Sequence, residues 1–470
     1  MLDKMKEECG VFGIYSKNKI DTFSLLQFGL IALQHRGQEA CGISILTEGN
    51  IYSFKKEGLV IDAFATIENP PLYQGNAAIG HTRYSTAGGQ SKRNIQPLYT
   101  KNADGDVSFS LAHNGNLVNN KSLREKMEME GISFVSNNSD TEVMLRIIEK
   151  HFNEGIDVAV KQVYDQVKGA YSCVLLTRKS LVAFRDPHGI RPLSLGRLED
   201  GAYAVSSETC GLDAIGAEFI RDIEPGEMIV IDNDGVRSFD IQKNNKRGLC
   251  SFEFIYFSRP DSVLEGNSIY SFRELSGKKL WDQSKIEADV VIGVPDSGVP
   301  AAIGYSNASG IPFRPILLKN KYLGRSFIVP SQEMRERTVM LKLNPIVSEI
   351  KGKRVIIMDD SIVRGTTSKR LVNIFKQAGA KEIHFISASP PIIAPCFLGL
   401  DTPEKEHLIA AKNSQEEIKN YLGVDSLTFL SLENLQNLLK EAGYCFGCFN
   451  EKYPVQRAET KHQKAATAID

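Results

Sequence analysis

The sequence lacks the features of several protein classes. Its 56 Lys and Arg residues against 57 Asp and Glu give a formal net charge of −1, which excludes a strongly basic nucleic-acid binder. Its most apolar stretches, such as Val355–Met358 and Ile392–Leu400, are short or broken by proline, so none can span a membrane. The first residues contain no apolar core, so they do not form a secretory signal. We therefore expect a cytoplasmic protein.

The cysteines do not suit a disulfide scaffold. There are eight in 470 residues, and without export they indicate thiol or metal chemistry. The chain is 42% hydrophobic and 24% charged, which is ordinary for a globular protein. Its length suggests two or three domains.

The first part, from Cys9 to about Asp240, alternates short β-rich runs with glycine turns and is interrupted by two helical stretches. One helix is expected over Asp21–Gln34. The other begins at Ser139, where Ser139 and Glu142 form a capping-box pattern. Strands grouped around helices predict an α+β layer fold. The expected strands include Gly10–Tyr15, Cys41–Leu46, Ala77–Gly80, Ser172–Thr177 and Met228–Ile231.

The second part follows a polar linker at Gln242–Arg247. Continuous apolar runs separated by helices predict a parallel sheet that is covered on both faces. The expected strands are Val290–Pro295, Ile316–Lys319, Val355–Met358 and Ile383–Ala388. The last residues are polar and are expected to form a tail.

The strongest local pattern lies at residues 355–368. A buried strand ends in Asp359 and Asp360, and the loop that follows carries Gly365 and three hydroxyl residues before a helix. Such a loop suits a phosphate, whereas the carboxylates suit a sugar diol or hydrated Mg²⁺. The spacing of a Walker loop is absent. The alternative, with no ligand, is an acidic turn that caps a helix.

This segment resembles the phosphoribosyl pyrophosphate (PRPP) motif of type I phosphoribosyltransferases. The resemblance implies that Asp359 and Asp360 hold the ribose hydroxyls and Mg²⁺, and that the 5′-phosphate is held by Arg364, Gly365, Thr366, Thr367 and Ser368. A second loop, 294–298, also follows an apolar strand. There the resemblance makes Asp296 a pyrophosphate contact and Ser297 a contact of the metal, although Asp296-Ser297-Gly298 alone could be a plain turn.

Cys9 lies unusually close to the chain start for a core residue. Cleavage after Glu8 would leave it with an α-amine, whose pKa near 7.7–8.0 would let it act as a general base for the adjacent thiol. Alone, Cys9 could equally be a small residue on an edge strand.

Four neighbouring segments have the composition of a site: 34–39 (QHRGQE), 81–86 (HTRYST), 113–116 (HNGN) and 139–140 (SD). With Cys9 they resemble the class II glutamine amidotransferase domain, an N-terminal-nucleophile fold of two stacked sheets.

That resemblance implies a role for each matching residue. Cys9 attacks the glutamine amide, and Asn114 and Gly115 form the oxyanion hole. Arg83 pairs with the substrate carboxylate, Asp140 holds its ammonium, and Arg36 shapes the pocket mouth. Neither His81 nor His113 receives a catalytic role.

Both signatures in this order resemble the amidophosphoribosyltransferase family, from Cys9 to about Pro454. The implied fold is an α+β N-terminal-nucleophile sandwich fused to an α/β type I phosphoribosyltransferase domain. Residues 1–8 would be a propeptide, 9–240 the amidotransferase domain, 241–454 the phosphoribosyltransferase domain and 455–470 a tail. The resemblance implies that ammonia from glutamine displaces pyrophosphate from PRPP and passes between the sites unprotonated. It further implies a homotetramer, feedback inhibition by purine nucleotides, and no nucleic-acid or membrane partner.

The basic segment from Lys319 to about Lys342 is, by the same resemblance, a loop that closes over PRPP. Lys319, Tyr322 and Arg325 are then expected to contact pyrophosphate or line the ammonia route. As a charge run alone, the segment could be a solvated face.

Cys445 and Cys448 form a C-x2-C pair, which needs two further thiols to complete a tetrahedral site. Zinc, an iron–sulfur cluster and two unliganded thiols all remain open from the residues alone. Part of the family carries a [4Fe–4S] cluster, and its ligand contexts match Cys250, Cys396, Cys445 and Cys448.

Two other functions fit part of the pattern. A salvage-type phosphoribosyltransferase would have a nucleobase pocket and no use for Cys9, Arg83, Asn114 and Asp140. A non-enzymatic PRPP or nucleotide sensor would have lost either the nucleophile or the Asp359–Asp360 pair, and this sequence keeps both.

Overall fold

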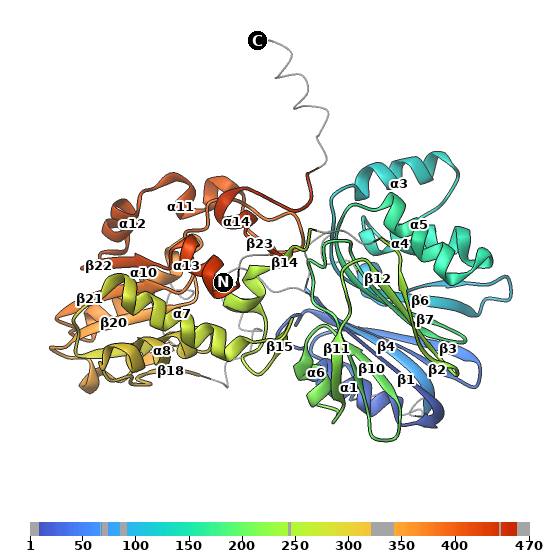
Figure 1. Cartoon of the computed structure of the whole chain (residues 1–470), viewed down its shortest axis with the longest axis horizontal. Helices are drawn as coiled ribbons and strands as arrows, with labels where there is room; N and C mark the ends of the chain where they lie inside the picture. The colour runs from blue at the N-terminus through green and yellow to red at the C-terminus, as the bar shows by residue number, and fades with distance from the viewer. Residues whose placement is uncertain are drawn as a thin grey trace, which may run out of the picture.

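The computed structural model describes residues 9–65, 67, 74–84, 92–242, 246–320, 343–440 and 443–457. Figure 1 shows two bodies side by side, the N-terminal half in blue to green and the C-terminal half in yellow to red. Within the described residues, no helix is both long and apolar enough to cross a bilayer.

The N-terminal half contains two antiparallel sheets. The first has the strand order β11-β9-β10-β1-β4-β2-β3 and the second the order β13-β12-β8-β7-β6-β5. The first sheet comprises β1 (Gly10–Ile20), β2 (Ala40–Thr47), β3 (Asn50–Glu57), β4 (Gly75–Arg83), β9 (Ser194–Arg197), β10 (Tyr203–Ser206) and β11 (Glu218–Asp222). The second comprises β5 (Leu98–Lys101), β6 (Val107–Leu117), β7 (Gly169–Thr177), β8 (Leu181–Arg185), β12 (Glu227–Asp232) and β13 (Gly235–Asp240).

The two sheets stack face to face because their central strands are apolar on both faces. Every residue of β2 and β7 is buried. Val11, Ile79, Ala112 and Val174 belong to the core between the sheets. Helix α1 packs on the outer face of the first sheet, and α4 and α5 pack on that of the second. The helices of this half are α1 (Thr22–Ala32), α2 (Val60–Phe64), α3 (Asn120–Met129), α4 (Asp140–His151), α5 (Ile156–Gln166) and α6 (Thr209–Asp213).

Helix α4 starts where the sequence predicts, but the predicted capping box is wrong. Ser139 is the N-cap and makes no side-chain capping bond. The Glu142 carboxylate instead accepts hydrogen bonds from the backbone N–H groups of Val135 and Ser136, at 2.8 and 2.7 Å. The Glu142 carboxylate therefore binds the loop before the helix, and not the first turn of the helix as the pattern predicts.

The C-terminal half is built on a parallel sheet with the order β17-β20-β21-β22. Its strands are β17 (Val290–Gly293), β20 (Arg354–Asp359), β21 (Glu382–Ser387) and β22 (Ser426–Phe429). Its helices are α7 (Ile269–Ser284), α8 (Val299–Ser309), α10 (Thr366–Gln377), α11 (Ile409–Lys412), α12 (Gln415–Leu422), α13 (Leu432–Leu438) and α14 (Gly447–Asn450).

One predicted strand of this sheet is wrong, and another was missed. Within the predicted run Ile316–Lys319, β18 (Leu317–Lys319) pairs antiparallel with β19 (Leu343–Pro345) in a separate small sheet. Only its first residue is buried, so it does not form a central strand. The fourth parallel strand is β22, whose residues alternate between half-buried and buried. This alternation is typical of an edge strand, not of a continuous apolar run.

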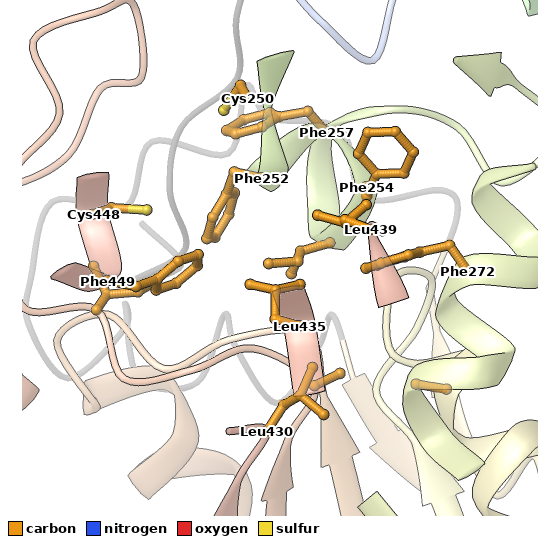
Figure 2. Close-up of a cluster of buried hydrophobic side chains, with 14 of the residues drawn as sticks. Cys250, Phe252, Phe254, Phe257, Phe272, Leu430, Leu435, Leu439, Cys448 and Phe449 are labelled. Atoms are coloured by element: carbon orange, nitrogen blue, oxygen red, sulfur yellow. The ribbon is translucent and has the colours of Figure 1, made fainter. Parts of the chain in front are cut away.

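The C-terminal segment returns to the start of the second half. Strand β14 (Leu249–Cys250) pairs in parallel with β23 (Tyr444–Cys445). After β14 comes a π-helical turn, η4 (Glu253–Phe257). Figure 2 shows Phe254 and Phe257 of this turn in one buried cluster with Leu435 and Leu439 of the C-terminal segment. The segment that links the halves is thus anchored in the core of the second half.

Candidate active sites

Cys9 lies directly before β1, at the edge of the first sheet. The pairing of Gly10 with Thr82 in β4 sets Cys9 opposite Arg83. The Cys9 thiol lies 3.6 Å from the carbonyl oxygen of Tyr84. Burial lowers the pKa of Arg83, while the charges of Cys9 and Glu39 act in the opposite direction. The structure thus brings the predicted nucleophile and the predicted carboxylate-binding arginine together.

Asn114 and Gly115 lie on the central strand β6 of the second sheet. Asn114 is 1% exposed, and neither atom of its side-chain amide has a hydrogen-bond partner within the part of the chain that the structure describes. Gly115 has a φ of +143°, and a Cβ atom there would lie 2.0 Å from the Ala170 carbonyl oxygen. Only glycine fits this position. A buried, unsatisfied amide beside a glycine is the arrangement that an oxyanion hole requires.

Asp140 begins helix α4 and is 8% exposed. Its carboxylate accepts hydrogen bonds from the backbone N–H groups of Leu117 and Thr141, at 3.2 and 2.8 Å. Burial alone would raise the pKa of Asp140, but His113 and these N–H groups outweigh it and hold the pKa below its usual range. The carboxylate is therefore ionised at neutral pH, as binding of an ammonium group requires.

The two histidines of these segments are buried. His81 is fully buried, and neither ring nitrogen has a partner among the described residues. Burial, followed by the charge of Arg83, lowers the pKa of His81 to about 3, so the ring is neutral. His113 contacts Thr141 Oγ1 at 3.3 Å and the Ala170 carbonyl at 3.5 Å. These contacts hold the ring with its Nδ1 atom 3.7 Å from the Asp140 carboxylate.

Arg36, predicted at the mouth of the glutamine pocket, is 1% exposed. Its Nε donates to the carbonyl oxygen of Cys9 at 3.2 Å. Its two terminal nitrogens donate to Glu208 and Glu253. The structure thus shows it holding the main chain of the nucleophile, and a direct contact with glutamine stays a prediction.

The predicted phosphate loop joins β20 to α10. Asp359 and Asp360 are each 1% exposed. The Asp360 carboxylate accepts hydrogen bonds from Ser361 Oγ at 2.7 Å and from Ser297 Oγ. The two loops that the sequence singled out therefore meet at Asp360.

The loop ends at the N-terminus of α10, where Gly365 is the N-cap with a φ of +80°. A Cβ atom at Gly365 would lie 2.7 Å from Ile409 Cδ1, so glycine is needed here both for the turn and for space. Thr366, Thr367 and Ser368 then form the first turn of α10. Their backbone N–H groups are the natural place for a phosphate.

The second loop carries Asp296, whose carboxylate accepts a hydrogen bond from Lys319 Nζ at 2.5 Å. Both side chains are at least half exposed, so they face the entrance of the site. The other predicted pyrophosphate contacts, Tyr322 and Arg325, lie outside the described residues. Arg364 is exposed at the end of the first loop.

The four predicted cluster ligands gather near the junction of the halves. Cys250 pairs directly with Cys445 in the β14–β23 ladder. Two backbone N–H groups of residues 393 and 394, just before Cys396, donate to the carbonyl oxygen of Cys448. Burial, followed by the charges of the other three thiols, raises the pKa of Cys448 well above its ordinary value. Figure 2 shows Cys250 and Cys448 at one side of the buried cluster, next to Phe252 and Phe449.

The four thiols lie near one another, but their arrangement is not that of a metal-binding site. No two of the eight cysteines are joined in a disulfide. Among the described residues, no group of three or more His, Cys, Asp or Glu side chains has the geometry of a metal site. The donor set, four sulfur atoms with two in buried positions, nevertheless suits an iron–sulfur cluster or zinc better than a hard cation.

Contacts between the halves lie close to strand β6. Asn116 Nδ2 donates to the Phe397 carbonyl at 2.9 Å, and Arg191 Nη2 donates to the Leu398 carbonyl at 2.7 Å. Gly399 is so near that a Cβ atom there would lie 3.3 Å from the carbonyl carbon of Gly115. The loop after Cys396 therefore packs on the strand that carries Asn114 and Gly115.

Sequence reasoning missed Glu208 and Glu253, which are connected to Cys9 through Arg36. Both are fully buried and bind Arg36. A signal for Glu253 existed, because it is the only charged residue in the otherwise apolar run 252–257 (FEFIYF). A lone carboxylate in such a run needs a buried partner.

Comparison with known families assigns each half. Residues 81–214 match the glutamine amidotransferase domain family. Residues 265–389 match the phosphoribosyl transferase domain family.

The chain is similar over nearly its whole length to enzymes from distant organisms. It is 44% identical to the amidophosphoribosyltransferase of Bacillus subtilis, covering 96% of this chain and 95% of that one. It is 46% identical to the chloroplastic amidophosphoribosyltransferase of Vigna aconitifolia, covering 97% and 93%. It is 43% identical to the amidophosphoribosyltransferase of Methanocaldococcus jannaschii, covering 95% of this chain and 98% of that one.

Solved structures agree with these similarities. The glutamine PRPP amidotransferase of B. subtilis complexed with ADP and GMP superposes with a TM-score of 0.89 at 43% identity, covering 96% of this chain and 98% of that one. A structure described as the allosteric regulatory enzyme of purine biosynthesis superposes with a TM-score of 0.90 at 44% identity, covering 96% and 97%. The predicted fold class, an N-terminal-nucleophile sandwich joined to a phosphoribosyltransferase domain, is confirmed.

Proposed function

The chain belongs to the amidophosphoribosyltransferase family and catalyses glutamine-dependent amidation of PRPP, the first committed step of purine biosynthesis, and we propose which of its residues carry the two half-reactions. Its likeness to whole amidophosphoribosyltransferases, amidotransferase half included, leaves no reason to retain the salvage-enzyme or sensor alternatives. We propose that the domains divide at residues 240 and 241, with 1–8 as a propeptide and 455–470 as a tail.

In the first half-reaction the Cys9 sulfur attacks the side-chain amide carbon of glutamine. The α-amine of Cys9, exposed by removal of residues 1–8, takes the thiol proton and passes it to the leaving nitrogen. The C–N bond breaks, ammonia leaves, and water then hydrolyses the thioester to glutamate. Residues 1–8 lie outside the described residues, so their removal is a prediction that intact mass spectrometry of the purified protein tests.

The other glutaminase residues bind the substrate and stabilise its charge. The side-chain amide of Asn114 and the backbone N–H of Gly115 donate to the oxyanion. Arg83 binds the carboxylate of glutamine and Asp140 its ammonium. Arg36 supports the pocket through the Cys9 carbonyl. The observation that carries this assignment is the buried, unsatisfied amide of Asn114.

In the second half-reaction ammonia attacks C1 of PRPP while the bond from C1 to pyrophosphate breaks. Asp359 and Asp360 hold the ribose hydroxyls, and residues 364–368 hold the 5′-phosphate. Asp296, Lys319, Tyr322 and Arg325 contact pyrophosphate. Ammonia is largely protonated at neutral pH and then has no lone pair with which to attack, so a route closed to water between the two sites keeps it reactive.

We propose that Mg²⁺ accompanies PRPP at Asp359, Asp360 and Ser297, because oxygen ligands suit this ion. When bound, it neutralises the charge of the leaving pyrophosphate. The contact between Ser297 and Asp360 supports one shared site.

We also propose a [4Fe–4S] cluster held by Cys250, Cys396, Cys445 and Cys448. When bound, it would join β14, β23, α14 and the loop that carries Cys396. Iron and sulfide analysis of anaerobically purified protein tests this, with zinc analysis of the same sample. Two irons or fewer per chain would contradict the proposal.

The regulatory and assembly properties are proposals as well. Inhibition by purine nucleotides is supported by the B. subtilis structure with ADP and GMP. A homotetramer is consistent with apolar side chains exposed on α1 and α2, such as Phe28 at 52% and Ile61 at 59%, and light scattering tests it. A cytoplasmic location is consistent with eight cysteines that form no disulfide.

The decisive test is a Cys9→Ala variant of the mature enzyme, assayed with glutamine and then with an ammonium salt. Phosphoribosylamine synthesis from glutamine should be lost, while synthesis from ammonia persists. Cys173→Ala is a matched control, because this thiol is fully buried in the core of the second sheet. If the Cys9 variant retained glutamine-dependent synthesis, the proposed nucleophile would be wrong.

A further inference from the structure

A group of four charged side chains is completely buried where the two halves meet. Arg36 and Arg191 come from the glutaminase half, as does Glu208, whereas Glu253 begins turn η4 after the linker. None of the four is more than 1% exposed. Buried charges are costly unless each is paired, so a group of this kind indicates a specific role.

The four side chains neutralise one another. Arg36 binds Glu253 in bidentate fashion, with distances of 3.0 and 2.7 Å, and binds Glu208 at 2.5 Å. Arg191 lies 3.5 Å from Glu253. Burial would raise the pKa of Glu253, but Arg36 and Arg191 outweigh it and keep the carboxylate ionised. Two positive and two negative charges therefore balance.

The group also touches the proposed nucleophile. Arg36 Nε donates to the Cys9 carbonyl oxygen at 3.2 Å. The guanidinium is planar, so a bidentate partner fixes the direction of all its N–H groups. The orientation of Nε, and with it the main chain of Cys9, therefore depends on where the Glu253 carboxylate lies.

On its other side Glu253 is held by the phosphoribosyltransferase half. Ser258 Oγ donates to its carboxylate at 2.7 Å. Arg273 of α7 donates to the carbonyl oxygens of Phe254 and Ser258, each at 2.8 Å, and so clamps both ends of η4. Arg273 is 4% exposed. Burial lowers the pKa of Arg273 to about 10, and the charge of Asp360, in the phosphate loop, acts in the opposite direction.

We propose that Glu253 is a positioning residue of the glutaminase reaction, which fixes Arg36 and thereby the main chain of Cys9, and transmits the position of η4 to the nucleophile. This inference rests on the proposed role of Cys9. The proposal assigns Glu253 no contact with glutamine or PRPP. This role of Glu253 would make the geometry of the glutamine site depend on the position of η4, a turn that belongs to the PRPP-binding half.

The test uses Glu253→Gln and Glu253→Asp variants of the full-length enzyme. Gln keeps the shape and removes the charge; Asp keeps the charge but is one methylene too short for the bidentate pair. Glutamine hydrolysis in the presence of PRPP should fall about 100-fold in kcat/KM for Gln, since a small displacement of a reacting group costs that much. Asp should recover part of this loss. Ammonia-dependent synthesis in the same samples should change by no more than about twofold.

Glu265→Gln is the matched control. Glu265 also joins the halves, pairing with Arg185 at 3.1 Å and Arg247 at 3.0 Å, outside the group around Arg36. It should leave glutamine hydrolysis close to that of the parent enzyme. A general loosening of the interface would affect the Glu265 and Glu253 variants alike.

A double-mutant cycle with Arg36→Lys shows whether Glu253 acts through Arg36. If it does, the second substitution should add little to the first. Should Glu253→Gln fail to fold, as loss of ammonia-dependent synthesis would reveal, Glu253→Asp carries the same test. Unchanged glutamine kinetics in the folded variants, or fully additive effects in the cycle, would overturn the proposal. Retained glutamine activity in Cys9→Ala would instead overturn the proposed nucleophile on which it rests.

Discussion

Replacing Asn114 by alanine should separate activity from stability. Its amide is 1% exposed, and within the described residues it has no hydrogen-bond partner. A buried polar group that lacks partners costs about 1–3 kcal/mol of folding free energy. If the amide serves the transition state of glutamine hydrolysis, the folded protein carries this cost for the sake of catalysis.

The expected change in the free energy of unfolding has two opposing parts. Removing the amide relieves about 1–3 kcal/mol, while the cavity left by a group of its size costs about 1 kcal/mol. The free energy of unfolding should therefore be unchanged or rise by up to about 2 kcal/mol. Loss of one oxyanion-hole donor should reduce kcat for glutamine hydrolysis by about 100- to 1,000-fold.

The assay pairs glutamate release with urea unfolding of the same preparation. Asn116→Ala is the control, because Asn116 lies two residues further along β6 and its amide does have a partner, the Phe397 carbonyl at 2.9 Å. Its removal should destabilise the protein by about 1 kcal/mol. The free energy of unfolding should thus be unchanged or raised in the Asn114 variant and lowered in the Asn116 variant. An Asn114 variant that is destabilised like the control, with hydrolysis reduced less than tenfold, would refute the reasoning.

Three further outcomes are expected. Ser297→Ala removes a hydrogen bond to the buried Asp360 carboxylate and should raise the KM for PRPP about tenfold in ammonia-dependent synthesis; an unchanged KM would argue against one shared site. Gly399→Ala should destabilise the protein by about 1–3 kcal/mol in urea, because its φ is +116° and the added methyl would lie 3.0 Å from Arg191 Nη2. Burial tends to raise the pKa values of Glu208 and Glu253, but the effect of their cationic partners is larger and holds both pKa values below the ordinary 4.5. Below that pH the unfolded chain binds more protons, so the free energy of unfolding should fall as pH decreases; Glu253→Gln should show a shallower decrease in urea titrations between pH 5 and 3, and an equal slope would contradict this.

The sequence predicted the parts of each site that lie within one short segment. Asp359, Asp360 and Gly365 follow one another at a strand end, so their chemistry is visible without tertiary structure. Cys9 and Arg83 were assigned through resemblance, since nothing local shows that they meet across β1 and β4.

The remainder depended on tertiary structure. Glu208 and Glu253 lie far apart in the chain. They come together only in the fold, where both bind Arg36 at the junction of the halves. The capping box failed for a similar reason, because the loop before α4 competes for the Glu142 carboxylate. Strand β18 has an apolar sequence but a mostly exposed position. Apolar composition alone does not distinguish a central strand from a short peripheral one.

Helix α7 has a practical consequence for the study of this enzyme. It contains Trp281, the only tryptophan among the 470 residues, whose ring meets that of Tyr305 edge-on with centroids 5.6 Å apart. The same helix carries Arg273, which clamps η4. The unlabelled native enzyme therefore has a single tryptophan, which lies on the helix that clamps η4. Its emission, excited selectively over that of the tyrosines, reports the state of that helix without any engineered probe.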